Sequence, residues 1–297
     1  MPQKIRKAVF PVGGLGTRFL PSTKALPKEM LPVANIPLIQ RAFMEAKEAG
    51  IEQFIFINGR NKNVISNHFD IVYELNSVLS ENAKARELSI INDWLPESGK
   101  TVFIRQQQTA GLGHAILCAK DAVGDEPFAV ILADELLYSP NSEENFLKNM
   151  VRLYQERDAN IIGLAEVAKS EVKKYGIADG STDKTNSKVL NLVDLVEKPE
   201  VEKAPSNFSI TGRYILKPEI FEFLKNQKAG VNSEIQLTDA MKKMMDSSDF
   251  LGLIFKGLRY DCGSPDGWLE ANIALSLLNK ETKEKTIEII DRCKRLT

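Results

Sequence analysis

Apolar runs rich in valine, isoleucine and phenylalanine alternate along this chain with segments whose apolar residues recur at helical spacing. The apolar runs predict strands over residues 8–12, 54–57, 101–105, 128–133, 161–167, 189–197, 210–216 and 251–255. The helically spaced segments predict helices over residues 38–49, 72–88, 113–123, 142–155, 218–226, 235–245, 265–279 and 282–293. Because strands that are apolar throughout are buried on both faces, this alternation predicts a mostly parallel sheet with helices on each side.

Length, charge and cysteine content narrow the classes of protein that the chain fits. Its 297 residues suit about two domains, or one α/β domain with an insertion. The net charge of −1 is spread evenly, which argues against a nucleic-acid-binding surface. We find no signal peptide and no run near the ~18 apolar residues of a membrane span, so we expect a cytoplasmic protein without a membrane partner. Three widely spaced cysteines predict reduced thiols, not disulfides or a zinc site.

The most informative motif directly follows the first predicted strand. The run Gly13-Gly14-Leu15-Gly16-Thr17-Arg18 is followed within a short stretch by Lys24 and Lys28. Glycines let consecutive backbone N–H groups approach an anion closely, and the three cations add positive charge beside them. This loop therefore predicts a site for a polyphosphate. The alternative is a simple glycine turn with solvated cations, but a turn requires fewer glycines and cations than this loop has.

Two better-known phosphate motifs do not fit. A dinucleotide-binding loop needs a small residue at the position that Phe19 occupies, which argues against a hydride-transfer enzyme. A Walker loop needs a glycine five positions before its Gly-Lys-Thr end, and Trp94 stands at that position before Gly99.

In a doubly covered sheet, ligands bind beyond the carboxyl ends of the strands, and two aspartates stand at such positions. Asp134 follows the strand predicted over residues 128–133, and Asp261 precedes a predicted helix that Ser264 would cap. Each could be an ordinary turn or cap residue. Considered together with the cationic loop, the two carboxylates predict a Mg²⁺ site that faces a bound triphosphate.

Other strand ends carry weaker signals. Gln106 could pair with the imide edge of a pyrimidine, and Gly111 would let the backbone lie close to the base. Glu197 and Lys198 could bind a sugar hydroxyl and a phosphate, although an isolated pair of this kind is more often a solvated ion pair. His114 and Cys118 have the spacing of a catalytic dyad, but their apolar neighbours favour a core helix.

Several motifs together resemble the bacterial UTP–glucose-1-phosphate uridylyltransferases, also called UDP-glucose pyrophosphorylases. The signature run is PVGGLGTRFLPSTKALPKEMLP at residues 11–32. Further blocks follow in order almost to the end of the chain: GLGHA at 111–115, VEKP at 196–199, APSN at 204–207, GRY at 212–214, EIQLTDA at 234–240 and DCG at 261–263.

The resemblance implies a Rossmann-like fold in which a mixed β-sheet is sandwiched by helices. It implies one nucleotidyltransferase domain over residues 1–297, with a sugar-binding portion within about 165–265 and a C-terminal helical segment over 265–297. The implied reaction joins UTP and glucose 1-phosphate into UDP-glucose and pyrophosphate, with Mg²⁺ as cofactor. Homodimers or homotetramers are also implied, and the apolar residues of the last predicted helix fit such contacts.

Carried over by position, the resemblance assigns a role to each candidate residue. Arg18 and Lys28 are the expected catalytic residues, and Asp134 and Asp261 the expected Mg²⁺ ligands. The expected binding residues are Gly14, Gly16, Thr17, Gln106 and Gly111 for the nucleotide and Gly176, Glu197 and Lys198 for the sugar phosphate.

The sequence departs from the family pattern at a few positions, among them Gly13, Ala133 and residues 107–110. Two alternatives therefore stay open. One is a related transferase that uses dTTP or CTP, or the 1-phosphate of galactose or glucosamine. The other is a non-catalytic regulator that binds sugar nucleotides, because such folds are reused for sensing.

Overall fold

A computed structural model describes residues 2–139, 145–227 and 234–296. Its centre is a nine-stranded sheet in the order β5-β4-β1-β6-β11-β8-β12-β10-β9. The bounds of these strands, in chain order, are β1 Lys7–Val12, β4 Gln53–Asn58, β5 Thr101–Arg105, β6 Phe128–Ile131, β8 Asn160–Glu166, β9 Gly176–Thr182, β10 Val189–Glu197, β11 Phe208–Leu216 and β12 Phe250–Ile254.

The sheet is mixed, so the mostly parallel sheet expected from the pattern alone is wrong, while the mixed sheet implied by the resemblance is confirmed. Strands β5, β4, β1 and β6 are parallel to one another, as are β8 and β12. Between these groups, β11 runs antiparallel to both β6 and β8. The remaining strands, β10 and β9, also pair in antiparallel fashion. The apolar composition of a strand does not predict its direction, because a strand can be buried on both faces whether it runs parallel or antiparallel to its neighbours.

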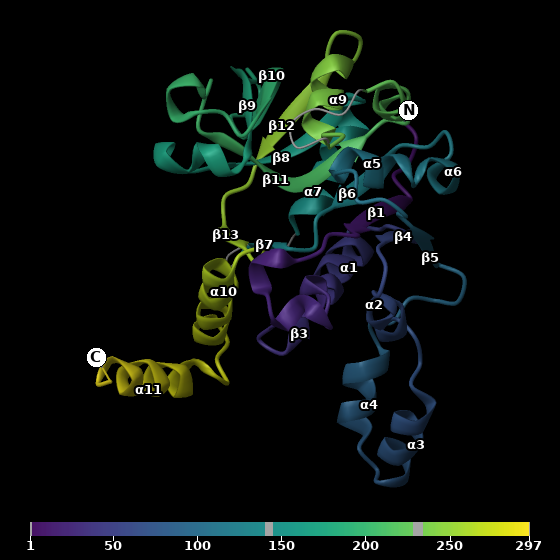
Figure 1. Ribbon diagram of the computed structural model, residues 1–297, viewed down its shortest axis with the longest axis vertical. Helices are drawn as coiled ribbons and strands as arrows, with labels where there is room; N and C mark the ends of the chain where they lie inside the picture. The colour runs from purple at the N-terminus through teal and green to yellow at the C-terminus, as the bar shows by residue number, and fades with distance from the viewer. Residues whose placement is uncertain (1, 140–144, 228–233, 297) are drawn as a thin grey trace.

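Helices cover both faces of the sheet (Figure 1). On one face α1 and α7 pack on a core that includes Phe10, Phe43 and Met150. On the other, α5, α8 and α9 pack on a core that includes Ile116, Phe221 and Met241. The helices are α1 Leu38–Glu48, α2 Asn63–His68, α3 Tyr73–Glu81, α4 Ala85–Asn92, α5 Leu112–Leu117, α6 Lys120–Val123, α7 Phe146–Arg157, α8 Ile220–Lys225, α9 Leu237–Met244, α10 Pro265–Leu278 and α11 Lys283–Lys294.

Most predicted helices differ from the structure by one or two residues at their ends, and three differ more. The helix predicted over 72–88 is two helices, α3 and α4, separated at Ala83, which has a φ of 52°. The helix predicted over 113–123 is likewise divided into α5 and α6. For the helix predicted over 142–155, residues 142–144 lie outside the described residues, and α7 begins at Phe146 after the side chain of Asn145 caps it.

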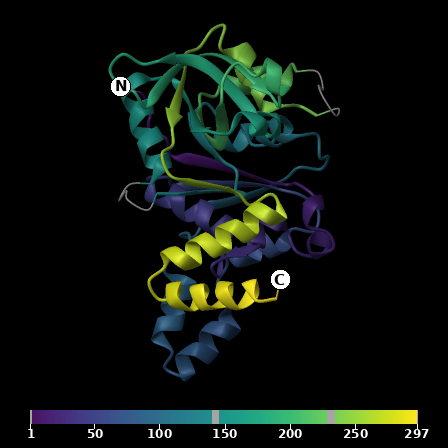
Figure 2. The same ribbon diagram turned by 90° about the vertical axis from the view of Figure 1, so that its left-hand side faces the viewer.

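Smaller elements sit beside the main sheet. Strands β7 (Glu135–Tyr138) and β13 (Leu258–Asp261) form a two-stranded antiparallel ladder, and β2 (Pro32–Val33) pairs with β3 (Ile36–Pro37). A third apolar cluster joins Leu136, Tyr260 and Leu275, so α10 packs beside this ladder. Figure 2 shows α10 and α11 running side by side at the C-terminal end. Within the described residues, no helix is long and apolar enough to cross a membrane.

Candidate active site

The glycine loop lies at the carboxyl edge of β1, where the neighbouring strand ends press closely against it. A Cβ on Gly13 would lie 2.7 Å from Oε1 of Gln106, and one on Gly59 would lie 2.8 Å from the Gly13 carbonyl oxygen. Gly16 has a φ of 67°, and its carbonyl accepts a 2.7 Å hydrogen bond from the Thr23 hydroxyl. The ends of β1, β4 and β5 thus meet at one edge, as the sequence predicted for the glycine loop and Gln106.

Lys28 reaches across this edge to Asp134. Its Nζ lies 2.5 Å from Oδ2 of Asp134, and its Cε lies 3.8 Å from the position of a Cβ on Gly14. Burial lowers the pKa of Lys28, but the adjacent carboxylate more than compensates and raises it overall. Burial likewise raises the pKa of Asp134, and the Lys28 ammonium outweighs this and holds the carboxyl pKa below its usual range. Both groups are therefore charged at neutral pH.

Asp134 and Asp261 converge on Gly263. A Cβ at Gly263 would lie 2.9 Å from one carboxylate oxygen of each aspartate, so those two oxygens are at most twice that distance apart. The Gly263 N–H donates to Asp261 at 3.0 Å, and its carbonyl accepts from Arg18 Nη1 at 3.5 Å. The structure thus brings Arg18, Lys28 and both aspartates together from three separate segments of the chain. Among the described residues, no three carboxylate, imidazole or thiol groups gather into a larger metal cluster.

Gln106 and Gly111 are also brought together. The Gln106 side chain is buried, and its amide nitrogen donates to the Gly111 carbonyl at 3.3 Å. The same nitrogen lies 3.0 Å from Nδ1 of His114, so this histidine, interpreted from the sequence as a packing residue, holds the glutamine amide in place. Gly111 has a φ of 95°, a conformation that favours glycine, and it caps α5.

The candidate sugar-phosphate residues form a separate group at the paired ends of β9 and β10. Glu197 is directly opposite Gly176 in the ladder, and a Cβ on Gly176 would lie 3.2 Å from the Glu197 carboxylate. The Thr238 hydroxyl donates to that carboxylate at 2.7 Å. Lys198 Nζ lies 3.5 Å from the Glu197 carboxylate, and the lysine side chain is largely exposed whereas that of Glu197 is only 24% exposed. A cavity of about 150 Å³ is lined by Gly176, Glu197 and Thr238, together with Glu135, the residue after Asp134.

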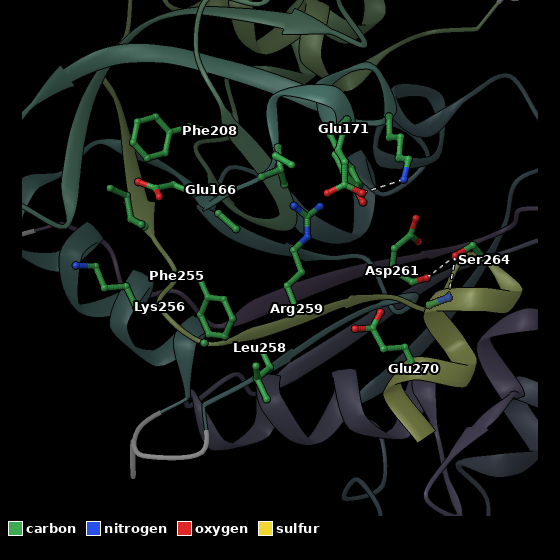
Figure 3. A pocket seen from close by; sticks show the side chains of 18 of the residues that line it. Glu166, Glu171, Phe208, Phe255, Lys256, Leu258, Arg259, Asp261, Ser264 and Glu270 are labelled. Carbon is green, nitrogen blue, oxygen red and sulfur yellow. Dashed lines mark hydrogen bonds and ion pairs between the residues drawn. The ribbon is translucent and has the colours of Figure 1, made fainter. Parts of the chain in front are cut away.

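A larger cavity of about 1440 Å³ borders one or two residues of each group. Arg18, Asp261 and Lys198 all line it, although they belong to the glycine loop, β13 and the end of β10. Figure 3 shows Arg259 and Asp261, from the same strand, beside this space, with Ser264 capping the following helix. The larger cavity therefore borders Arg18, next to the glycine loop, and Lys198, next to Glu197.

Several residues that support this edge were not predicted from the sequence. Lys62 and Glu29, the residue after Lys28, form a buried ion pair at 2.8 Å. Arg213, buried on β11, donates to Glu45 and to the carbonyls of Leu132 and Glu135 that flank Asp134. Such partners are far apart in sequence, and only Arg213, a charged residue within an apolar strand, carries a signal that could have marked it.

The geometry is that of a glycine loop, a lysine and two converging carboxylates at the carboxyl edge of a helix-covered sheet. The family model described as nucleotidyl transferase matches residues 7–276. The chain belongs to this family.

Named relatives agree with this family. A UTP–glucose-1-phosphate uridylyltransferase of Pseudomonas aeruginosa is 44% identical over 90% of this chain and 94% of its own length. A solved structure described as UTP-bound UGPase from Acinetobacter baumannii is 38% identical and has a TM-score of 0.88, covering 96% of this chain and 98% of the other. A UDP-glucose pyrophosphorylase complexed with UDP-glucose is 45% identical with a TM-score of 0.81, covering 91% of this chain and 98% of the other. The resemblance stated from the motifs and the expected fold class are thereby confirmed.

Proposed function

We infer that this protein transfers a uridylyl group from UTP to glucose 1-phosphate, forming UDP-glucose and pyrophosphate. The observation that carries this inference is the convergence of Lys28, Asp134 and Asp261 beside the glycine loop, in a chain that is similar to uridylyltransferases over nearly its whole length. A regulator that only binds sugar nucleotides would not need a lysine placed between the phosphate loop and two carboxylates.

The glycine loop and the glutamine beside it form the proposed nucleotide site. Backbone N–H groups of the loop suit the triphosphate, because glycines allow close approach to phosphate oxygens. Gln106, held by Gly111 and His114, is the proposed reader of the base. The loop residues that we assign to the nucleotide are Gly14, Gly16 and Thr17.

Glucose 1-phosphate would lie in the space between Glu197 and the glycine loop. The Glu197 carboxylate accepts hydrogen bonds and suits sugar hydroxyls, and Gly176 leaves room beside it. The exposed ammonium of Lys198 would neutralise the phosphate. All three residues border one of the two cavities described above.

Asp134 and Asp261 fit a magnesium ion. Mg²⁺ in nucleotide enzymes is bound by one or two carboxylates together with substrate phosphates and water, and two convergent carboxylates are what this edge offers. When bound, the ion would neutralise the charge of the triphosphate.

The chain's own residues then supply positioning and charge. A sugar phosphate with a second pKa of about 6 is mostly dianionic at neutral pH, so its oxygen can attack the α-phosphorus without a general base. Arg18 and Lys28 would stabilise the charge that develops on the leaving pyrophosphate in an in-line displacement. The chain has only two histidines, His68 and His114, and this mechanism requires neither as a base.

A pyrophosphate-release assay with a matrix of substrates tests this function. UTP, dTTP and CTP would each be combined with the 1-phosphates of glucose, galactose and glucosamine. We expect the highest kcat/KM with UTP and glucose 1-phosphate. A preference for another pair of substrates would identify a related transferase instead. No turnover with any pair would indicate a non-catalytic regulator that binds sugar nucleotides.

We further propose a cytoplasmic homodimer or homotetramer. All three cysteines are unpaired, which fits a reducing compartment. Helices α10 and α11 expose large apolar side chains, among them Leu269 at 55% and Ile287 at 43%, and such side chains suit burial in a subunit contact. Light scattering on the purified chain would give the subunit number.

A further inference from the structure

Glu135, the residue after Asp134, forms a bidentate ion pair with Arg259. Arg259 Nε donates to one carboxylate oxygen of Glu135 at 2.9 Å, and Nη2 donates to the other at 2.7 Å. The exposed fractions of the two side chains are only 10% and 12%. Paired N–H···O bonds of this kind fix the orientation of both groups as well as their separation.

The pair joins the two segments that carry Asp134 and Asp261. Glu135 directly follows Asp134, and Arg259 stands two residues before Asp261 on β13, so Arg259 and Asp261 lie on the same face of that strand. In the β7–β13 ladder Asp261 is directly opposite Glu135. The side-chain pair therefore crosses the ladder at the end where both aspartates project.

This ladder depends on support from outside. It has only two strands of four residues each, and an isolated two-stranded ribbon is at best marginally stable in water. Arg259 connects it to the main sheet, because the same guanidinium donates to the Ser209 hydroxyl and to the Ile210 carbonyl, both on β11. Arg213, also on β11, donates to the Glu135 carbonyl at 2.9 Å.

The two aspartates need such support, since like charges that converge on one point repel each other. We propose that the Glu135–Arg259 pair is a positioning device that sets the separation of Asp134 and Asp261 for a divalent cation. This inference rests on the proposed function, in which those aspartates bind the metal. Neither Glu135 nor Arg259 is assigned contact with the reacting atoms.

The proposal distinguishes a positioning role from a merely structural one through the metal dependence of nucleotide binding. The affinity for UTP would be measured twice, by calorimetry, once with Mn²⁺ and once in EDTA. Arg259→Lys keeps the positive charge but loses the bidentate hydrogen bonding, and Glu135→Gln keeps the shape of the side chain but loses its negative charge. We expect both variants to bind Mn²⁺–UTP about 10-fold or more weakly, as is typical when partners of metal ligands are changed, and to bind metal-free UTP like the unmodified protein.

Three controls make the result decisive. Asp134→Asn and Asp261→Asn should remove the gain in UTP affinity that Mn²⁺ provides. Arg157→Lys alters another arginine–carboxylate pair, with Asp183 as partner, and should change nothing. The thermal midpoint of each variant shows whether it is folded, and the two substitutions in the pair provide independent routes to the same test.

Two results would overturn the proposal in distinguishable ways. If the aspartate variants lose the Mn²⁺ effect while folded Arg259→Lys and Glu135→Gln keep it, the cation site stands and the positioning role is wrong. If the aspartate variants bind Mn²⁺–UTP normally, the metal assignment in the proposed function is itself wrong, and the positioning role fails with it.

Discussion

At the scale of single residues, the candidate site combines groups that could be predicted with groups that could not. The glycine loop and the two aspartates were predicted because each stands at a strand end and carries residue types suited to phosphate or Mg²⁺. Lys28 was predicted because it adds a cation shortly after the loop. The buried arginines were not predicted. Arg259 and Glu135 are 124 residues apart, and Arg213 and Glu45 are 168 apart, so no local spacing connects them.

Lys28→Ala should lower kcat far more than it weakens glucose 1-phosphate binding. The ammonium acts on charge that develops at the leaving group, and the loss of one such stabilising group typically costs about 10²–10³ in kcat. Steady-state kinetics of pyrophosphate release would measure both parameters. Lys84→Ala, a change of an exposed lysine between α3 and α4, is the control. Unchanged turnover in Lys28→Ala would remove this lysine from the chemistry.

The three thiols should differ sharply in reactivity. Burial raises the pKa of Cys262 to about 12 and also raises that of the half-buried Cys118, whereas Cys293 is exposed. Because the thiolate is the reactive species, a higher pKa leaves less of it at pH 8. We expect a single fast phase with Ellman's reagent in the native protein, lost in Cys293→Ser. A fast phase that persists in that variant would contradict the assigned burial.

At the scale of elements, the ion pair between Glu29 and Lys62 joins the turn that carries Lys28 to the start of α2. Lys62→Met would leave a buried carboxylate without its partner, which typically costs about 3–5 kcal/mol. The double variant Glu29→Leu/Lys62→Met removes both charges and should recover most of that loss. Urea unfolding of the three proteins measures these differences. Equal destabilisation in the single and double variants would mean that packing, not the unpaired charge, sets the cost.

The loss in Lys62→Met should also grow with pH. Burial raises the pKa of Glu29 above its ordinary value of 4.5, and removal of Lys62 leaves that effect less opposed. A carboxyl whose pKa is higher in the folded state stabilises the fold below its unfolded pKa, and this stability is lost as pH rises through the folded pKa. The difference in unfolding free energy between Lys62→Met and the unmodified protein should therefore be smaller at pH 4.5 than at pH 8. The double variant, which lacks the carboxyl, serves as the control.

Most elements could be placed from the sequence, but their bounds and divisions could not always be. The long apolar strands have a clear pattern, whereas β7 and β13 are four residues each and too short for one. Neither glycine nor proline marks the break between α3 and α4, because Ala83 adopts the positive φ there. The two strands that were not predicted, β7 and β13, matter for function because they position Asp134 and Asp261.

At the scale of the whole molecule, the directions of the strands in the sheet could not be predicted from the sequence pattern. Insertion of β11 between two parallel groups depends on pairings between distant segments, and apolar strands carry no mark of direction. The consequence is functional. A register shift in β11 between Ile210 and Tyr214, at Gly212 with a φ of 60°, brings Arg213 opposite the end of β6. From there Arg213 reaches the turn that carries Asp134.

In the proposed function, one cleft joins basic groups and two aspartates around a magnesium-bound nucleotide. The most direct test is the rate of pyrophosphate release from UTP and glucose 1-phosphate by Asp134→Asn, measured over a range of Mg²⁺ concentrations. Asp121→Asn, an exposed aspartate on α6, is the control. We predict that Asp134→Asn needs about 10-fold or more Mg²⁺ for half its maximal rate, while the control is unchanged. A normal magnesium dependence in Asp134→Asn would mean that the metal is bound elsewhere, and it would contradict this account.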